Sequence, residues 1–258
     1  MSILDFFRRR KGSPSAALTP SVDELLARVA AHRRTGWLPR TEEAPGPPAG
    51  AKLGGMPLLG IDEAWPACGN CQRPMQLFLQ LPGASLPAGM GLVPSGRVLQ
   101  LFYCTSAKPH CESTCSAWQS PGASTCLRLV NAEVSPGALA ESPVADAFPE
   151  RRIAGWDAVD DYPCGEELDL LGAALDEVEE ETLMNEGYPR EKDKLGGWPC
   201  WIQSVSYPEC PDCGRAMSHL FQIDSHDNLP YMFGDAGMLH LFMCPEHPQR
   251  LGMNWDCA

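Results

Sequence analysis

An internal repeat limits the folds open to this chain more than any other feature of its sequence. Residues 52–81 align without a gap on residues 194–223, and the similarity resumes between residues 99–104 and 239–244, where the offset is two residues smaller. Such a duplication predicts two related halves built from the same fold unit. The identical pairs of the first block are Lys52/Lys194, Leu53/Leu195, Gly54/Gly196, Gly55/Gly197, Pro57/Pro199, Pro66/Pro208, Cys68/Cys210, Cys71/Cys213, Arg73/Arg215, Met75/Met217 and Gln80/Gln222.

Each unit has the same order of features. It opens with Gly-Gly-x-Pro, continues with C-x-x-C and a strand-like run, and ends with a second run that finishes in Cys and is followed by Trp118 or Trp255. In residues 238–244, Leu239 and Leu241 alternate with His240 and Phe242, the period-two pattern of a strand. The architecture is therefore expected to be β-rich.

The second half carries the stronger metal-binding pattern. A two-residue gap lets both thiolates of one tight turn reach a single ion, and a Cys-x-x-His pair about thirty residues later completes a tetrahedral set. Gly214, directly after the turn, allows the backbone to curl around the sulfur atoms. The predicted zinc ligands of this half are Cys210, Cys213, Cys244 and His247.

The first half offers a matching set whose fourth member is open. Cys111 is favoured, because it lies seven residues before the Trp of its repeat and His247 lies eight residues before the other; His110 and Cys115 compete for the same role. The predicted ligands of this half are Cys68, Cys71, Cys104 and Cys111.

Two complete four-ligand sets predict two structural Zn²⁺ ions, because a catalytic zinc keeps one position for water. A redox C-x-x-C opens a helix, whereas both turns here precede strand-like sequence. Disulfides need an oxidising compartment, and no signal peptide or membrane-length apolar run indicates one, so we expect a cytoplasmic protein with reduced thiols. The remaining cysteines are expected to be small buried groups: Cys115, Cys126, Cys164, Cys200 and Cys257.

Outside the repeat, two helices and a linker are expected. Ser21 and Glu24 form a capping box that begins an amphipathic helix reaching Ala30, and the Pro-rich residues 41–50 are interpreted as a linker. A second helix is expected over residues 166–184, where acids crowd the C-terminal half and oppose the helix dipole, which suggests a cationic partner or a solvated face.

These elements predict an α+β, β-rich fold of two pseudo-repeated β-sheet halves, with a connecting acidic helix and an N-terminal helix. We expect four segments: a basic segment, helix and linker over residues 1–50, a first zinc-binding half over 51–156, an acidic helical connector over 157–193 and a second zinc-binding half over 194–258. The basic residues 1–11 could touch a membrane surface, but such a short amphiphile favours a frayed end instead.

The charge balance excludes a nucleic-acid-binding body. The chain has 33 Asp and Glu against 20 Lys and Arg, a net charge of −13, whereas phosphate binding needs a basic face. Residues 157–193 hold fourteen acids against Arg190 and Lys192, a net charge of −12. An acidic belt of this kind favours solubility or a basic protein partner.

No catalytic constellation stands out. The run from Asp224 to Asp227 contains Ser, His and Asp, but adjacent residues cannot take the converging geometry of a triad, so a strand end and turn are expected there. His219 and His240 lie on expected strands, where a histidine is usually a structural residue whose ring nitrogens are hydrogen-bonded. The sequence therefore indicates a protein without enzymatic activity.

The motifs KLGGWPCWIQ, LFQIDS, GDAGMLHLF and NWDC resemble the bacterial YwqG-like domain, a domain of unknown function, over about residues 50–258. The paired cysteines depart from its simpler members and are similar to those of the programmed cell death protein 2 relatives, which share the LGGxPxW and Gln motifs. That resemblance implies a dedicated chaperone for a small-subunit ribosomal protein, and related bacterial domains imply immunity proteins encoded beside toxin genes.

We therefore expect a non-enzymatic, zinc-stabilised protein-binding module, with an immunity protein that neutralises a cognate toxin as the preferred task. One alternative is a dedicated chaperone for a basic client such as a ribosomal protein. The other is a zinc-dependent hydrolase, in which one ion keeps an open position.

Overall fold

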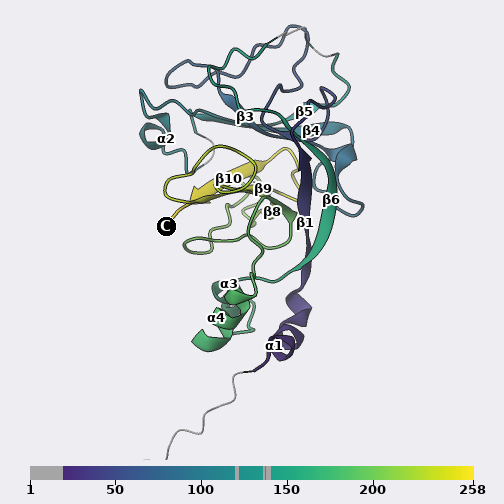
Figure 1. The fold of residues 1–258 in the computed structure, drawn as a ribbon, viewed down its shortest axis with the longest axis vertical. Coiled ribbons are helices and arrows are strands. Elements are labelled where there is room, and N and C mark those ends of the chain that lie inside the picture. The colour runs from purple at the N-terminus through teal and green to yellow at the C-terminus, as the bar shows by residue number, and fades with distance from the viewer. Residues whose placement is uncertain (1–19, 120–121, 136, 138–140) are drawn as a thin grey trace, which may run out of the picture.

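A computed structural model describes residues 20–119, 122–135, 137 and 141–258. Within this part of the chain, ten strands form one sheet in the order β10-β9-β8-β7-β1-β6-β2-β3-β4-β5 (Figure 1). The predicted basic segment at residues 1–11 lies outside the described residues. The strands are β1 (Arg34–Glu42), β2 (Lys52–Leu53), β3 (Gln76–Pro82), β4 (Arg97–Tyr103), β5 (Thr125–Asn131), β6 (Arg151–Asp161), β7 (Lys194–Gly196), β8 (Ser218–Asp224), β9 (Met238–Met243) and β10 (Leu251–Asp256).

The helices are short and mostly gather at one end of the molecule. Helices α1, α3 and α4 lie at the lower end in Figure 1, whereas α2 lies beside the first half of the sheet. None of the helices in the described ranges has the length and apolar character needed to cross a membrane. Their bounds are α1 (Val22–Arg28), α2 (Cys111–Thr114), α3 (Gly165–Leu170) and α4 (Glu177–Asn185), with 3-10 turns η2 (Ala30–His32) and η3 (Gly83–Ser85).

Two long strands occupy the centre of the sheet. Strands β1 and β6 pair antiparallel, with Arg34 opposite Asp161 and Glu42 opposite Arg152. Strand β2 pairs with β6, and β7 pairs with β1, so that each repeat attaches to one member of the central pair. The interpretation of residues 41–50 as a linker is wrong at its start, because Thr41 and Glu42 belong to β1.

The repeat of the sequence is visible in the strand order. Strands β2 to β5 run outward on one side of the central pair, and β7 to β10 run outward on the other. Both repeats carry the same irregularity, which falls between Leu77 and Leu79 in β3 and between His219 and Phe221 in β8. The β-rich architecture is confirmed, and the repeated units lie on either side of the central pair in one continuous sheet instead of forming two separate sheets.

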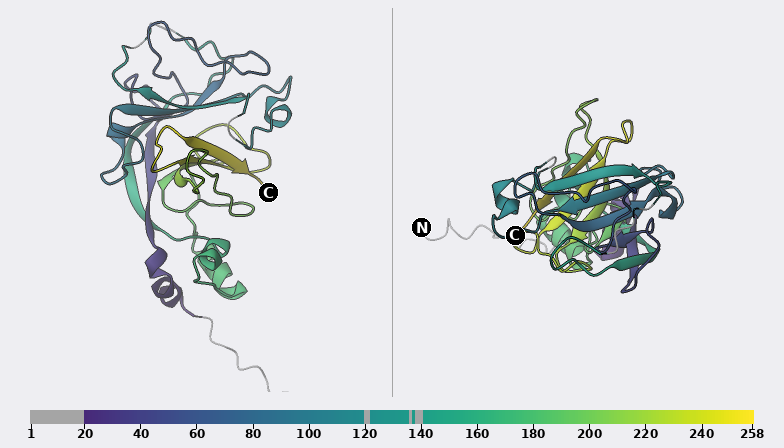
Figure 2. Two further views of the ribbon diagram at one scale, coloured as in Figure 1. Left: turned by 180° about the vertical axis from the view of Figure 1, so that it is seen from behind. Right: turned by 90° about the horizontal axis from the view of Figure 1, so that it is seen from above.

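The sheet curls so that its two halves enclose a shared core (Figure 2). Edge strands β5 and β10 contact each other, and Gln119 forms a bridge with Asn254. The main core combines buried residues from both repeats. In its aromatic part, the ring centroids of Phe78 and Tyr231 are 5.1 Å apart, and Trp255 donates a hydrogen bond to the Tyr103 hydroxyl at 3.0 Å. Neither repeat therefore has a complete core of its own.

The single helix expected over residues 166–184 is two helices. Helix α3 ends at Leu170, and the chain passes through Gly172 in the left-handed region, with φ of +76°, before Asp176 caps α4. The expected conflict between the acids and the helix dipole is wrong for the same reason. Glu177, Glu179 and Glu180 occupy the first turn of α4, where the dipole favours negative charge.

The N-terminal helix forms as predicted and packs on the acidic segment. The Ser21–Glu24 capping box is present, with the Ser21 backbone N–H donating to Glu24 at 2.8 Å. Arg28 pairs with Glu179 of α4. The apolar side of this small helical lobe is a separate core of buried residues: Leu25, Val29, Tyr162, Leu168 and Leu183.

A buried glutamine performs the same task in each repeat. Gln80 lies opposite Lys52 and accepts a hydrogen bond from the Leu58 N–H at 2.7 Å, while its amide group donates to the carbonyls of residues 48 and 50. Gln222 lies opposite Lys194 and makes the equivalent contacts with residues 200, 190 and 192. The identical glutamines thus hold the entry loops of both repeats against the sheet, satisfying backbone groups that burial removes from water.

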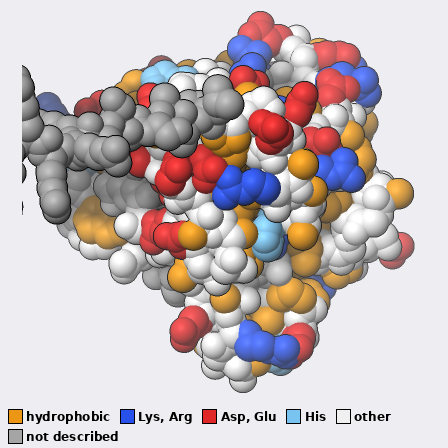
Figure 3. Space-filling model, turned by 90° about the horizontal axis from the view of Figure 1, so that it is seen from below, with side chains coloured by type: hydrophobic (Ala, Val, Ile, Leu, Met, Phe, Trp, Pro, Cys, Tyr) orange, Lys and Arg blue, Asp and Glu red, His pale blue; other side chains and the backbone are white. Residues whose placement is uncertain are grey.

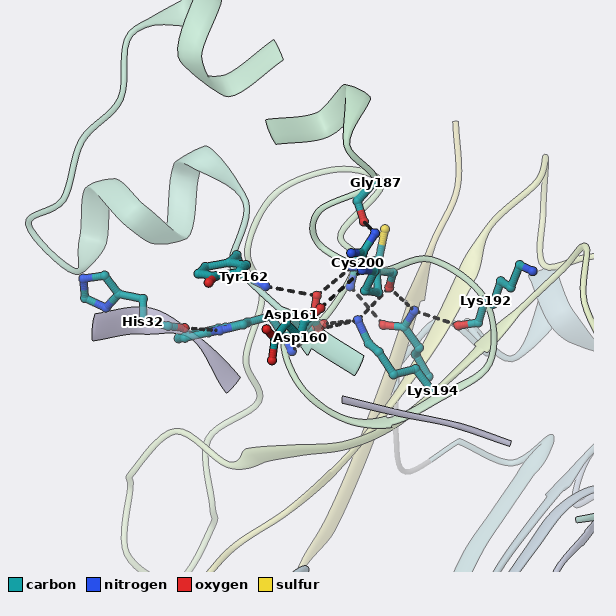
Figure 4. Close-up of polar contacts among 11 residues, drawn as sticks. His32, Asp160, Asp161, Tyr162, Gly187, Lys192, Lys194 and Cys200 are labelled. Carbon is teal, nitrogen blue, oxygen red and sulfur yellow. Dashed lines mark hydrogen bonds and ion pairs between the residues drawn. The ribbon is translucent and has the colours of Figure 1, made fainter. Parts of the chain in front are cut away.

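The identical lysines are both buried beside an acid. Lys52 Nζ lies 3.1 Å from Glu150, whose side chain keeps 14% exposure. Lys194 Nζ lies 2.7 Å from Asp161, and both side chains are fully buried. Asp161 also accepts hydrogen bonds from the backbone N–H groups of Tyr162, Arg190 and Trp198 (Figure 4). Burial lowers the pKa of Lys194, and the charge of Asp161 opposes this change.

We predict that Lys194→Met destabilises the protein by about 3–5 kcal/mol, because it leaves the Asp161 carboxylate buried without its counter-charge. Lys52→Met is the matched control and should destabilise less, since Glu150 retains contact with solvent. Urea unfolding followed by tryptophan fluorescence measures both. Equal losses for the two variants would contradict the special role of the Lys194–Asp161 pair.

Candidate metal centres

The four predicted ligands of the second half come together at one end of strands β8 and β9. Cys210 and Cys213 lie in the turn before β8, Cys244 follows β9, and His247 lies in the loop that leads to β10. The Cys210 and Cys244 sulfur atoms are 3.5 and 3.6 Å from His247 Nδ1, and the Cys213 and Cys244 sulfur atoms are 3.8 Å apart.

The first half forms an equivalent group of four thiols. Cys68 and Cys71 lie in the turn before β3, Cys104 follows β4, and Cys111 begins helix α2. The sulfur atoms of Cys68 and Cys111 are 3.8 Å apart, and those of Cys71 and Cys104 are 3.7 Å apart. Among the alternatives for the fourth position, the structure brings Cys111 into the group, whereas His110 Nδ1 lies 2.9 Å from the Ser113 hydroxyl.

Both groups fit a tetrahedral ion. Zinc–sulfur bonds of about 2.3 Å place the sulfur atoms of a tetrahedral site about 3.8 Å apart, which agrees with the separations above. In each group all four ligand atoms lie within 4.8 Å of one another. The donor sets are Cys₄ and Cys₃His, the sets that structural zinc sites use. The chain thus contains two candidate metal sites whose four positions are filled by protein atoms.

The local backbone explains why both turns take the same shape. The N–H of Cys68 donates to the Arg73 carbonyl at 2.9 Å, and the N–H of Cys210 donates to the Arg215 carbonyl at 2.8 Å. Directly after the second cysteine the chain turns left-handed, at Gln72 with φ of +59° and at Gly214 with φ of +68°. This curl directs both thiols of each turn toward one point.

Backbone N–H groups also favour the thiolate form in these turns. Burial opposes ionisation of Cys71, but hydrogen bonds from the Arg73 backbone and the neighbouring thiols outweigh it and lower the pKa of Cys71 to about 7. Burial likewise opposes ionisation of Cys244, and the His247 backbone N–H and nearby groups lower its pKa to about 7. In the second group, a hydrogen bond from the Arg215 backbone also lowers the pKa of Cys213. Metal binding requires deprotonated thiols, so each group has at least one thiol prepared for it.

Each group has its own supporting contacts. In the first, the Asn70 amide donates to the Cys111 sulfur at 3.4 Å. In the second, the residue equivalent to Asn70 is Asp212, which pairs with Arg250 at 2.8 Å and ties the turn to the start of β10. The sequence comparison missed these partners, because they come from positions at which the two repeats differ.

The other predicted residues are placed less uniformly. Cys200 is buried as expected, whereas Cys115, Cys126, Cys164 and Cys257 are only half-buried. In the run from Asp224 to Asp227, the Ser225 hydroxyl donates to the Gly237 carbonyl at 2.6 Å, and Asp224 accepts from the His226 N–H at 2.8 Å. These contacts belong to the expected turn.

The two strand histidines lie on β8 and β9, as expected. Among the described residues, neither ring nitrogen of His219 or His240 has a hydrogen-bond partner, although both side chains are buried. The closest charged group to His240 is Asp256, at 3.7 Å. Each ring nevertheless has a polar group beside it, the Gly196 backbone for His219 and the Asp256 carboxylate for His240, so the expected structural role of both histidines stays a prediction.

Comparison with known proteins places the chain in a family. Residues 51–257 match the model of the domain of unknown function DUF1963, and the chain therefore belongs to that family. A stretch of 57 residues is 39% identical to the uncharacterized protein YpfL of Salmonella typhimurium. This match covers 22% of the chain and only 13% of the relative, so it concerns a small part of that protein.

We predict that Cys210→Ser lowers the zinc content of the purified protein from two ions to one and destabilises the second half, because three ligands hold the ion less tightly than four. Cys164→Ser, outside both groups, is the control and should retain two ions. Native mass spectrometry measures the metal content. Two ions retained in Cys210→Ser, or none in the unmodified protein, would contradict the assignment.

We also predict opposite effects at the two left-handed turn positions. Gly214→Ala should lower the free energy of unfolding by about 1 kcal/mol, since a side chain at positive φ is strained and the space around Gly214 is otherwise open. Gln72→Gly should give a smaller gain. Urea unfolding in the presence of zinc tests both, and a Gly214→Ala variant as stable as the parent would contradict the strain argument.

Proposed function

We propose that this protein is a non-enzymatic, protein-binding module held together by two structural Zn²⁺ ions. The observation that carries the proposal is the completeness of both ligand groups. Each supplies four protein donors, which leaves no position for the water that a catalytic zinc activates. Catalysis of the hydrolase type would require one of these ligands to leave.

The position of the two groups agrees with a structural role. Each ion would connect the loop before one strand, β3 or β8, with the chain that follows the neighbouring strand, β4 or β9. The cysteines of each group pack with only a small cluster of buried apolar residues. A metal ion at these sites would supply stability that such small clusters cannot, as it does in zinc-dependent domains.

The acidic segment supports a basic protein as the partner. Residues 157–193 carry a net charge of −12, and most of the acids on α3 and α4 are exposed. Opposite charge speeds the association of two proteins and makes it sensitive to salt. Because this charge is concentrated in one segment, it would also orient the approaching partner.

Neutralisation of a cognate toxin is the task we prefer within this class, and chaperoning of a basic client such as a ribosomal protein is the alternative. Both tasks require reversible binding of a basic protein to an acidic surface. The resemblance to the programmed cell death protein 2 relatives, and to related bacterial domains encoded beside toxin genes, supports this class of function. A toxin encoded beside the gene would favour the first task.

Affinity capture of the full chain from its native cells, followed by mass spectrometry, tests the proposal. We expect one abundant basic protein in stoichiometric amount, released when the salt concentration is raised, since salt screens charges on exposed surfaces. The control is the variant Glu177→Lys/Glu181→Lys, which should capture less of it. Absence of any stoichiometric basic partner would contradict the proposed function.

A further inference from the structure

We infer that a pocket beside helix α3 is the docking site for a basic segment of a protein partner, and that an apolar side chain of this segment enters the pocket. The inference rests on the proposed function and assigns its binding surface. The pocket has a volume of about 350 Å³, enough for one or two side chains. It lies between α3, the start of β1, the chain after β7 and the start of β8.

The walls of the pocket are mainly apolar. Leu170 and Leu171 form one side, and Trp198, Tyr207 and Met217 are among the residues on the others. Leu170 is 73% exposed and Leu171 is 45% exposed, an unusual position for leucines at the end of a helix. An apolar side chain placed here would cover both leucines, and this burial favours binding by the hydrophobic effect.

Polar groups that the fold leaves without partners line the same pocket. His219 is 6% exposed, and within the described residues neither of its ring nitrogens has a hydrogen-bond partner. Glu167 is 3% exposed; one carboxylate oxygen accepts from the Tyr207 hydroxyl, and the other makes no hydrogen bond of normal geometry among the described residues, although the Trp201 side chain lies beside it. Buried polar atoms of this kind are normally satisfied, so they indicate a missing ligand.

The chemistry of these groups suits a peptide. Burial lowers the pKa of His219 well below its usual value, so the ring is neutral and offers one N–H donor and one acceptor. A peptide group offers the same pair in return. The Glu167 carboxylate can accept from a second N–H or from the cationic head of Lys or Arg. Arg34 also lines the pocket; it stacks on Trp198 with 3.2 Å to the ring centroid, and its positive charge acts on Glu167.

The surroundings indicate a positively charged partner. No Lys or Arg occurs between residues 153 and 189, while Asp169, Glu177, Glu181 and Glu186 are all exposed. Apolar surface lies among these acids, because Val178 and Met184 on α4 are also exposed, by 53% and 68%. Figure 3 views the molecule from below and shows acidic and hydrophobic side chains side by side, with Lys and Arg side chains among them. A segment with alternating basic and apolar residues complements such a surface.

A defined probe tests this surface directly. The probe is the labelled peptide KLLKKLLKKLLK, and binding to the full-length, zinc-loaded protein is followed by fluorescence polarisation. We expect the variant Leu170→Asp/Leu171→Asp to bind the peptide at least about tenfold more weakly, since the leucine surface that the peptide would bury on binding is lost. The matched control Ile61→Asp changes another exposed apolar residue, 70% exposed in the first half, and should bind as the parent does.

Whether the leucine variant binds the peptide more weakly or more tightly than the parent separates pocket binding from simple charge attraction. Both aspartate variants become more acidic, so purely electrostatic binding of the peptide would strengthen in each.

The charge variant Glu177→Lys/Glu181→Lys should weaken binding more than its control, Glu133→Lys/Glu141→Lys. Failure of the parent protein to bind the peptide, or equal binding by the leucine variant and Ile61→Asp, would overturn the inference. Unchanged urea unfolding of each variant, followed by tryptophan fluorescence, shows that the fold is intact.

The cellular partner distinguishes this inference from the proposed function. A captured basic protein that binds the leucine variant as well as the parent would overturn the pocket and leave the function standing. Peptide binding that follows the expected pattern, without any basic protein captured from cells, would contradict the function and leave the pocket standing.

Discussion

The fully buried pair of Lys194 and Asp161 is the contact on which the arrangement of the molecule depends. Burying two charges is unfavourable unless each is paired and hydrogen-bonded, and a buried charge left alone is strongly destabilising. Asp161 lies at the end of β6 and Lys194 at the start of β7. The backbone N–H of Trp198 donates to Asp161, and its indole N–H donates to the His32 carbonyl at 2.8 Å. The second repeat, the central strands and the N-terminal segment must therefore come together at one point.

The two metal groups act at the opposite ends of the repeats from this junction. The central strands and the shared aromatic core hold the inner strands, but the C-x-x-C turns lie beyond that core and pack only with small clusters of their own. An ion bound by these four protein ligands would close each turn onto the strand beside it. The fold thus combines one core shared by both repeats with a separate candidate metal site in each.

The helical lobe combines stability with an exposed acidic surface. The capping box of Asp176 and the acids of the first turn favour helix α4 itself, so part of the negative charge has a local structural reason. The exposed acids beyond that first turn, Glu181 and Glu186, and the exposed leucines at the pocket have no such reason within the described structure. Exposed acidic and apolar side chains therefore occur together around the pocket, as they do on surfaces that bind other proteins.

The sequence by itself determined the repeat, its β-rich nature, the capping box at Ser21, all four residues of the second candidate metal group and three of the first. These features depend on short spacings or on alignment of one repeat with the other, and such relations are readable along the chain. Only the tertiary structure decided that β1 and β6 join the repeats into one sheet, that Cys111 completes the first group, and that Asp161 faces Lys194. These pairings connect residues far apart in the chain, where side chains meet through packing that no local pattern encodes.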